Sequence, residues 1–300
     1  MVELKYPNKV NIYEVGPRDG LQNEKKIIPT KIKVALIDML TSCNFKEIEI
    51  GSFVSPKWVP QMQDSLEVDR LIKKKKNIKY PILVPNLKGL EKAIAENIKT
   101  ICVFTTASES FSKKNTNCTV TQSLKRIEKI IYLANKNGIK TRGYISCVMG
   151  CPYEGSISFS KTANICKELN DLGCYEISLG DTIGVGTPID TFKMLDQVLK
   201  YINIKNLAVH FHDTYGQALS NILASLQKGI FKIDSSIGGL GGCPFAKGAK
   251  GNVATEDVVF MLNGMNISTG LTLKNIVKIS KFIFKYLERE PSSRVTNALR

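Results

Sequence analysis

The chain has no long apolar run, and this absence bears on where the protein works. No hydrophobic stretch approaches the roughly 20 residues that a membrane-spanning helix needs, although 43% of the 300 residues are hydrophobic. The segment 1–5 resembles neither the apolar core of a secretory signal nor an Arg-rich and Ser-rich transit segment. We therefore expect a soluble, cytoplasmic protein that has no membrane partner.

Closely spaced cysteine pairs are also missing. The chain has 8 cysteines but no C-x-x-C pair, which argues against a structural zinc knuckle. In a chain of this length the cysteines also form no compact disulfide pattern, so we expect free thiols in a reducing compartment.

Acidic residues are scarce relative to basic ones. The chain has 42 Lys and Arg against 27 Asp and Glu, which gives a net charge of +15. The one compact basic run, Lys73 to Lys76, is typical of a solvated helix end. No nucleic-acid-binding motif accompanies it, so we expect no nucleic-acid partner. A positive field would instead attract an anionic small-molecule substrate.

Apolar, β-branched runs alternate with helical patterns along the chain. The predicted strands cover residues 10–15, 47–53, 80–85, 100–105, 141–148, 175–179, 208–212 and 232–237. The predicted helices include residues 31–43, 121–136, 159–172, 189–201, 217–228, 255–262 and 273–287. About eight such units favour an α/β fold of the (β/α)8 TIM barrel type. We expect one catalytic domain over residues 1–300, with residues 267–300 as a helical C-terminal extension.

A doubly wound sheet is the alternative fold. It would normally carry a glycine-rich phosphate-binding turn after its first strand. The sequence at that place, residues 16–20 (GPRDG), is not such a turn.

Histidine is rare here, and both copies stand together. His210 and His212 are the only 2 histidines. On a strand, residues two apart point to the same side, so both imidazoles would enter one space. The pair suggests a metal site, to which Asp19 could add a carboxylate and Asn252 an amide oxygen. A six-coordinate ion such as Mg²⁺ or Mn²⁺ would suit this mixed donor set.

Other polar residues collect at the predicted carboxyl ends of the strands, where barrel enzymes build their active sites. Burying such charges without partners would be costly, so a shared site explains them better than chance does. This rim set comprises Glu14, Arg18, Asp19, Glu49, Ser52, Arg142, Asp181, His210 and His212. The loop after the last strand, residues 238–244, adds Cys243 among glycines that would let it move as a lid.

Chemical roles follow from these residue types. A metal would act as a Lewis acid toward a substrate hydroxyl and carbonyl. Arg18 can stabilise a developing enolate oxygen by charge-assisted hydrogen bonding. Cys243 could transfer a proton when the lid closes. Class I aldolase chemistry is disfavoured, because no lysine lies at a suitable inward position late in the predicted strands.

Five segments resemble the hydroxymethylglutaryl-CoA lyase family, and together they span nearly the whole chain. They are residues 14–24 (EVGPRDGLQNE), 52–62 (SFVSPKWVPQM), 180–188 (GDTIGVGTP), 210–218 (HFHDTYGQA) and 239–246 (GLGGCPFA). The resemblance implies a TIM barrel that uses Mg²⁺ or Mn²⁺ and cleaves the CoA thioester to acetyl-CoA and acetoacetate.

Residue roles implied by the resemblance are as follows. The metal ligands would be Asp19, His210, His212 and Asn252. The catalytic residues would be Arg18 on the substrate carbonyl, Cys243 and His210 in proton transfer, Glu49 as an active-site acid, and Asp19. The substrate-binding residues would be Arg18, Gln22, Ser52, Arg142 and Asp181. We also expect a homodimer.

Two other functions stay open. A related Claisen-type synthase, of the isopropylmalate or homocitrate kind, or a pyruvate aldolase would share the Arg-Asp pair and the His-x-His. The Cys243 loop and the lack of a regulatory domain argue against these enzymes. A non-catalytic basic binding protein is opposed by the rim of ionisable groups.

Overall fold

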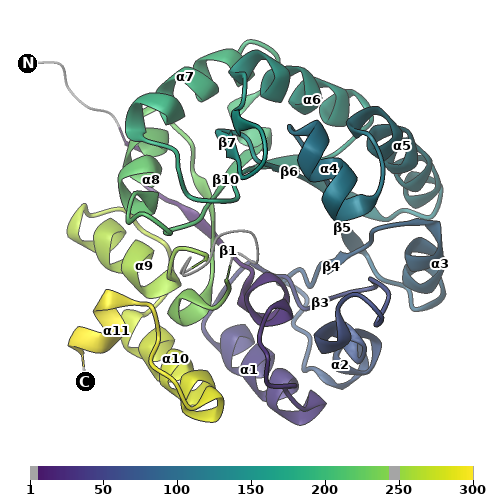
Figure 1. Cartoon of the computed structure of the whole chain (residues 1–300). Helices are drawn as coiled ribbons and strands as arrows, with labels where there is room; N and C mark the ends of the chain where they lie inside the picture. Colours follow the sequence, from purple (N-terminus) through teal and green to yellow (C-terminus); the bar gives the residue numbers. More distant parts are fainter. Residues whose placement is uncertain (1–5, 243–250, 300) are drawn as a thin grey trace, which may run out of the picture.

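A curled parallel sheet forms the centre of the molecule (Figure 1). The structure is a computed structural model that describes residues 6–242 and 251–299. The sheet has 9 strands in the order β2-β1-β11-β10-β9-β6-β5-β4-β3. Their bounds are β1 Asn11–Glu14, β2 Glu47–Ile48, β3 Gly51–Ser52, β4 Ile82–Leu83, β5 Thr100–Thr106, β6 Lys140–Ser146, β9 Glu176–Asp181, β10 Leu207–Phe211 and β11 Lys232–Ser235.

The sheet closes on itself through a broken strand. The sequence predicts one continuous strand over residues 47–53, but it is divided into β2, which pairs with β1, and β3, which pairs with β4. Across the break, the Glu49 N–H donates to Glu14 O on the β1 side at 2.9 Å, and the Ile50 N–H donates to Pro81 O on the β4 side at 3.0 Å. The two ends of the strand order are therefore one segment, and the predicted barrel is confirmed.

Helices form an outer ring around the strands, as Figure 1 shows. The helices that follow strands β1 to β9 in the chain are α1 Thr30–Ser42, α2 Ser65–Leu71, α3 Leu87–Ala95, α4 Glu109–Thr116, α5 Val120–Lys136, α6 Phe159–Asp171 and α7 Pro188–Val198. The last are α8 Ala218–Gln227, α9 Thr255–Gly264, α10 Leu273–Leu287 and α11 Arg294–Ala298. Capping boxes begin α5 at Thr119 and α7 at Thr187, where side chains satisfy the first free N–H groups. No helix in the described part of the chain is both long and apolar enough to cross a membrane.

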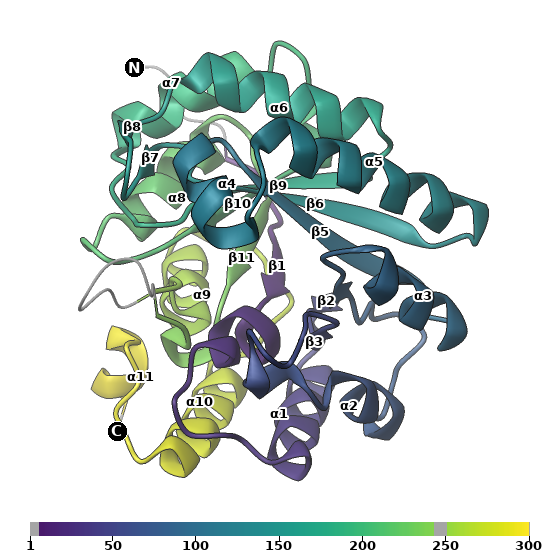
Figure 2. The same ribbon diagram turned by 45° about the vertical axis from the view of Figure 1, so that its right-hand side comes forward.

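The C-terminal helix α10 stands between α9 and α1 (Figure 1) and contacts both. In Figure 2, α10 lies beside α1 while α11 lies near α9, and both pairs are in contact. The face of α10 also meets the turn Ile237–Gly239 that follows β11. Gly238 in this turn has φ +62°, and a Cβ there would lie 2.2 Å from a ring atom of Phe284. Only glycine fits this conformation and this close approach.

Charged residues fill part of the barrel interior. Arg142 on β6 has no exposed surface, and its guanidinium lies over the Tyr13 ring. Nε donates to Glu176 at 2.6 Å, and Nη2 donates to Asp234 at 2.6 Å. Three of its five N–H groups are thus paired with Glu176 and Asp234 inside the barrel, and the predicted substrate-binding role of Arg142 stays a prediction.

Candidate active site

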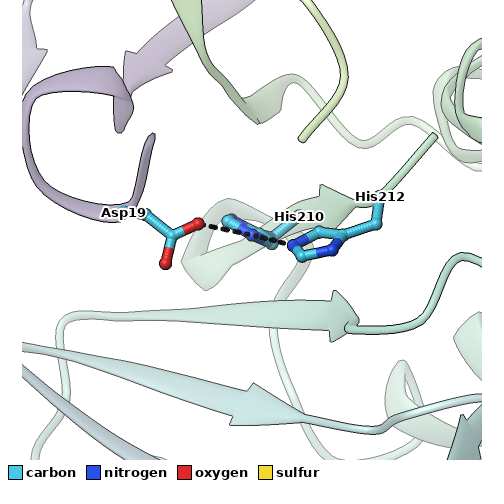
Figure 3. A group of neighbouring side chains, drawn as sticks. All are labelled: Asp19, His210 and His212. Atoms are coloured by element: carbon cyan, nitrogen blue, oxygen red, sulfur yellow. Dashed lines mark hydrogen bonds and ion pairs between the residues drawn. The ribbon is translucent and has the colours of Figure 1, made fainter. Parts of the chain in front are cut away.

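Two imidazoles and a carboxylate meet above the end of β10 (Figure 3). His210 lies on β10, His212 follows the strand, and Asp19 comes from the short π-helical turn Gly16–Gly20 after β1. The two Nε2 atoms are 3.4 Å apart, and His210 Nε2 lies 3.9 Å from Asp19 Oδ2. Ligand atoms of the three residues all lie within 4.8 Å of one another. The sequence therefore identified three residues that the fold does bring together.

The charge states of this cluster suit a cation. Burial, together with the nearby His210, lowers the pKa of His212 to about 4, so its imidazole is neutral at physiological pH. Burial alone would raise the pKa of Asp19, but Arg18, His210 and His212 oppose it and bring the pKa down to about 2. The cluster thus offers an ionised carboxylate and a neutral His212 imidazole, which is the form in which these groups bind metals.

The spacing of the cluster also fits one ion. Adjacent oxygen or nitrogen ligands bonded to Mg²⁺ at about 2.1 Å lie about 3 Å from each other. The separations of 3.4 and 3.9 Å are close to that value. In addition, Nδ1 of His212 is buried and has no hydrogen-bond partner among the described residues. No second hydrogen bond therefore turns the His212 imidazole away from the cluster.

Asn252 completes the group from the other side. It pairs with His212 in an isolated antiparallel bridge, and its Nδ2 donates to Asp19 Oδ2 at 2.8 Å and to Leu240 O at 3.2 Å. In this arrangement the amide nitrogen, rather than the oxygen, faces Asp19. A half-turn of the amide would present Oδ1 to the cluster, so the predicted ligand role of Asn252 stays a prediction.

Arg18 is held in place by two carboxylates. Nε and Nη2 donate to the two oxygens of Glu49 at 2.8 and 3.1 Å, and Nη1 donates to Asp19 at 2.6 Å. Glu49 is fully buried and also accepts a hydrogen bond from the Tyr144 hydroxyl at 2.5 Å. A guanidinium carries five N–H groups, so two remain for a ligand. The geometry makes Glu49 the support of Arg18.

The other predicted substrate-binding residues divide into two groups. Gln22 joins the cluster, because its Nε2 donates to Asp19 Oδ1 at 2.9 Å. Ser52 and Asp181 do not join it. Ser52 is buried and accepts from the Val54 N–H at 3.2 Å, while Asp181 is buried and accepts from the Gly186 N–H at 2.8 Å. Both support the backbone of their own loops. Cys243 lies outside the described residues.

Two neighbours of the site were not predicted from the sequence. Tyr144 supports Glu49, and Asp234 contacts His210 through its carboxylate at 3.3 Å. Asp234 is a charged residue inside the predicted strand 232–237. The criterion applied to the other rim acids, a charge within an apolar strand, would have identified it.

Glu14 binds backbone beneath the site and gives a prediction about pH. It accepts from the N–H groups of Gly16 and Ile237, both at 2.8 Å, and from the Thr255 hydroxyl at 2.7 Å. Burial raises the pKa of Glu14 to about 8 in the folded protein. The folded state therefore holds a proton that the unfolded chain releases near its ordinary pKa of about 4.3. Stability should be greatest at low pH in this window and fall as pH rises toward 8.

We expect Glu14→Gln to flatten that fall, by on the order of a few kcal/mol between pH 5 and 8.5. The measurement is the free energy of unfolding in urea at several pH values, with Glu91→Gln on the exposed face of α3 as control. Part of the slope should persist, since burial also raises the pKa of Glu256 to about 7 and that of Asp181 to about 6. An unchanged slope in Glu14→Gln would refute this account of Glu14.

Comparison with known proteins gives independent evidence about the family of this chain. The model of the HMGL-like family matches residues 9–283. The chain is 53% identical over 293 residues to the mitochondrial hydroxymethylglutaryl-CoA lyase of Bos taurus. The alignment covers 98% of this chain and 90% of that protein. Among solved structures, the hydroxymethylglutaryl-CoA lyase from Pseudomonas aeruginosa superposes with a TM-score of 0.96 at 49% identity, covering 98% of each chain.

A further solved relative carries ligands. An HMG-CoA lyase from Acinetobacter baumannii, solved in complex with coenzyme A and 3-methylmalate, superposes with a TM-score of 0.93 at 36% identity. The alignment covers 98% of this chain and 96% of that one. These similarities extend over both the barrel and the helices outside it.

Proposed function

This chain belongs to the HMGL-like family, and from that premise we propose that it is a carbon–carbon lyase that cleaves 3-hydroxy-3-methylglutaryl-CoA to acetyl-CoA and acetoacetate. The observation that carries the proposal is the 53% identity to a hydroxymethylglutaryl-CoA lyase over 98% of the chain. The cluster of Arg18, Asp19, His210 and His212 supports it, because retro-Claisen cleavage needs a base, an acid and a site that stabilises an enolate.

A divalent cation is part of the proposal, and Mg²⁺ or Mn²⁺ suits the donor set best. Asp19, His210, His212 and Asn252 would hold it. When bound, such an ion supplies Lewis acidity toward the oxygen atoms of the substrate. The cluster of Asp19 with the two imidazoles is consistent with this role.

The remaining chemistry falls to the side chains. A base, with His210 or Asp19 the nearest candidates, takes the proton of the C3 hydroxyl. The C2–C3 bond then breaks, which gives acetoacetate and the enolate of acetyl-CoA. Arg18 donates hydrogen bonds to the enolate oxygen, and the Cys243 thiol protonates C2. The base gains one proton and the thiol loses one, so the return of that proton to sulfur closes the cycle.

One assay decides between this reaction and its alternatives. The purified protein is incubated with 3-hydroxy-3-methylglutaryl-CoA and Mg²⁺ or Mn²⁺, with and without EDTA, and acetoacetate is measured. We expect product that depends on the metal. If the protein left this substrate intact and condensed acetyl-CoA with a 2-oxo acid, the synthase hypothesis would replace the lyase.

Cys243 gives a prediction that concerns only one step. Cys243→Ala should lower kcat by about 10²-fold, the lower range for removing a positioned acid or base, while metal affinity stays as in the wild type. Steady-state kinetics and metal titration of the same preparation measure both quantities. Cys118→Ala, which removes another buried thiol, is the matched control. Wild-type turnover in Cys243→Ala would show that the thiol has no part in the reaction.

The proposal also covers the cellular compartment and the oligomeric state of the protein. Relatives include a protein named as mitochondrial and one named as cytoplasmic, a 3-hydroxy-3-methylglutaryl-CoA lyase of Mus musculus. For this chain we propose the cytoplasm and a homodimer that binds a CoA thioester. Light scattering coupled to size-exclusion chromatography measures the assembly directly.

A further inference from the structure

Asp234 lies beside His210 but is not part of the cluster of Asp19, His210 and His212. It lies on β11, is 2% exposed, and pairs in register with His210 on the neighbouring parallel strand β10. Residues paired in this way project to the same side of a sheet, so both side chains enter the barrel. There, Asp234 Oδ2 lies 3.3 Å from Nδ1 of His210.

The Asp234 carboxylate is surrounded by donors. Arg142 donates from Nη2 to Oδ1 at 2.6 Å and from Nη1 to Oδ2 at 3.1 Å, and the Ser178 hydroxyl donates to Oδ2 at 2.7 Å. An ionised carboxylate beside a guanidinium can only accept hydrogen bonds. Its contact with His210 is therefore favourable only when Nδ1 carries the proton.

This constraint determines what His210 presents to the cluster. A neutral imidazole carries one proton, and if Nδ1 holds it, Nε2 keeps a free lone pair. That Nε2 faces His212 Nε2 at 3.4 Å and Asp19 Oδ2 at 3.9 Å. In the opposite tautomer, an N–H would point into the space between the ligand atoms and block it.

We propose that Asp234 is a positioning residue that fixes the Nδ1-protonated tautomer of His210 and so keeps Nε2 free to bind a divalent cation or accept a proton. Its importance for turnover rests on the proposed function. Arg142 and Ser178 hold the Asp234 carboxylate, and this explains why a fully buried arginine lies near the middle of the barrel. None of these three side chains touches substrate in this scheme.

The tautomer can be observed directly, because the chain has only 2 histidines. Full-length protein labelled with ¹⁵N-histidine gives two imidazole spin systems at pH 8 in two-dimensional NMR without added metal, and His212→Gln assigns them. We expect His210 to show a protonated Nδ1 and an unprotonated Nε2 in the wild type. If its Nε2 is the protonated nitrogen in the wild type, the proposal is wrong, and no variant is needed to show it.

Metal affinity provides the second test. Asp234→Asn replaces the obligate acceptor by an amide that can also donate to Nδ1, so we expect a mixture of tautomers. Loss of such an outer-shell partner typically weakens metal binding by about 10- to 100-fold. Titration calorimetry with Mn²⁺ measures this change. An unchanged tautomer together with wild-type affinity in Asp234→Asn would also overturn the proposal.

Glu176→Gln is the matched control. It removes the other carboxylate that pairs with Arg142 but makes no contact with His210. We expect its Mn²⁺ affinity to stay within about threefold of the wild type. If Glu176→Gln weakened binding as much as Asp234→Asn, a general loosening of the barrel interior would explain both effects. Neither measurement uses the CoA thioester. The test therefore remains valid even if the protein does not cleave that thioester.

Discussion

Replacing Arg18 with Gln is expected to lower kcat by about 10³- to 10⁴-fold while KM changes only a few-fold. Removing one donor to an oxyanion typically costs about 10²- to 10³-fold, and a charge-assisted bond is about twice as strong as a neutral one. Arg18 is ready for this task, since Glu49 and Asp19 fix its guanidinium with bonds of 2.6 to 3.1 Å. Its strongest interaction forms only as charge develops on the thioester oxygen, so kcat should carry the loss.

A loss of stability must be separated from this effect, because Arg18→Gln leaves two buried carboxylates without their cation. Lys33 offers the control. It is a buried cation that pairs with Asp64 at 2.6 Å and also donates to the Gln61 carbonyl oxygen, and neither residue belongs to the site. Lys33→Gln should lower the thermal unfolding temperature but leave kcat nearly unchanged. Equal losses of kcat in the two variants would mean that Arg18 acts only through stability.

Much of this site follows from the strand order alone. Asp19 follows the first strand and His210 lies on the seventh, 191 positions later in the chain, and nothing local connects them. In a barrel the carboxyl ends of parallel strands meet on one rim, so the fold class by itself predicts their approach. The cluster of Asp19 and the two histidines is the result.

Depth within the barrel could not be predicted in the same way. Arg142 is the third residue of β6, whose last residue is Ser146. At about 3.3 Å per residue it therefore lies about 13 Å below the carboxyl end of its strand. The residue type and the inward direction led to the prediction of a substrate-binding arginine, but the sequence did not indicate that its level in the barrel gives it the buried partners Glu176 and Asp234.

Asp181 shows a second limit. It does end β9 on the rim, as predicted, but its carboxylate accepts from the N–H groups of Val185 and Gly186. Buried backbone donors must find acceptors, and the loop after β9 takes this one. The pattern of the sequence gives no measure of such a competition between a ligand and the local backbone.

The break between β2 and β3 also depends on a local contact that the sequence pattern does not indicate. β3 begins at Gly51, where a Cβ would lie 2.5 Å from the Ser65 hydroxyl oxygen of α2. The apolar pattern over residues 47–53 predicts a strand but contains no sign of this close approach. The short helix α2 was not predicted either, because its seven residues are too few for helical periodicity to be clear.

Asp19→Asn should have an effect at least as large as that of Arg18→Gln, because it removes the only formal negative charge among the ligand candidates. The Lewis acidity that a cation supplies amounts to several kcal/mol, and each 1.4 kcal/mol is about tenfold in rate. We expect Mn²⁺ affinity to fall by more than about 10²-fold, since losing a ligand should exceed the cost of losing an outer-shell partner. Turnover at subsaturating metal should fall by about 10³-fold or more.

A charge swap makes this prediction specific. Asn252 Nδ2 donates to Asp19 Oδ2 at 2.8 Å, so the two side chains stand face to face in the cluster. The double variant Asp19→Asn with Asn252→Asp exchanges the carboxylate and the amide across that contact. We expect it to recover at least about tenfold of the lost Mn²⁺ affinity, because the total charge offered to the ion is restored. Recovery should be incomplete, since the new carboxylate would face the Leu240 carbonyl, which Asn252 Nδ2 reaches at 3.2 Å. Wild-type Mn²⁺ affinity in Asp19→Asn alone would show that the carboxylate binds no metal, and an affinity of the double variant no better than that of Asp19→Asn would place Asn252 outside the ligand set.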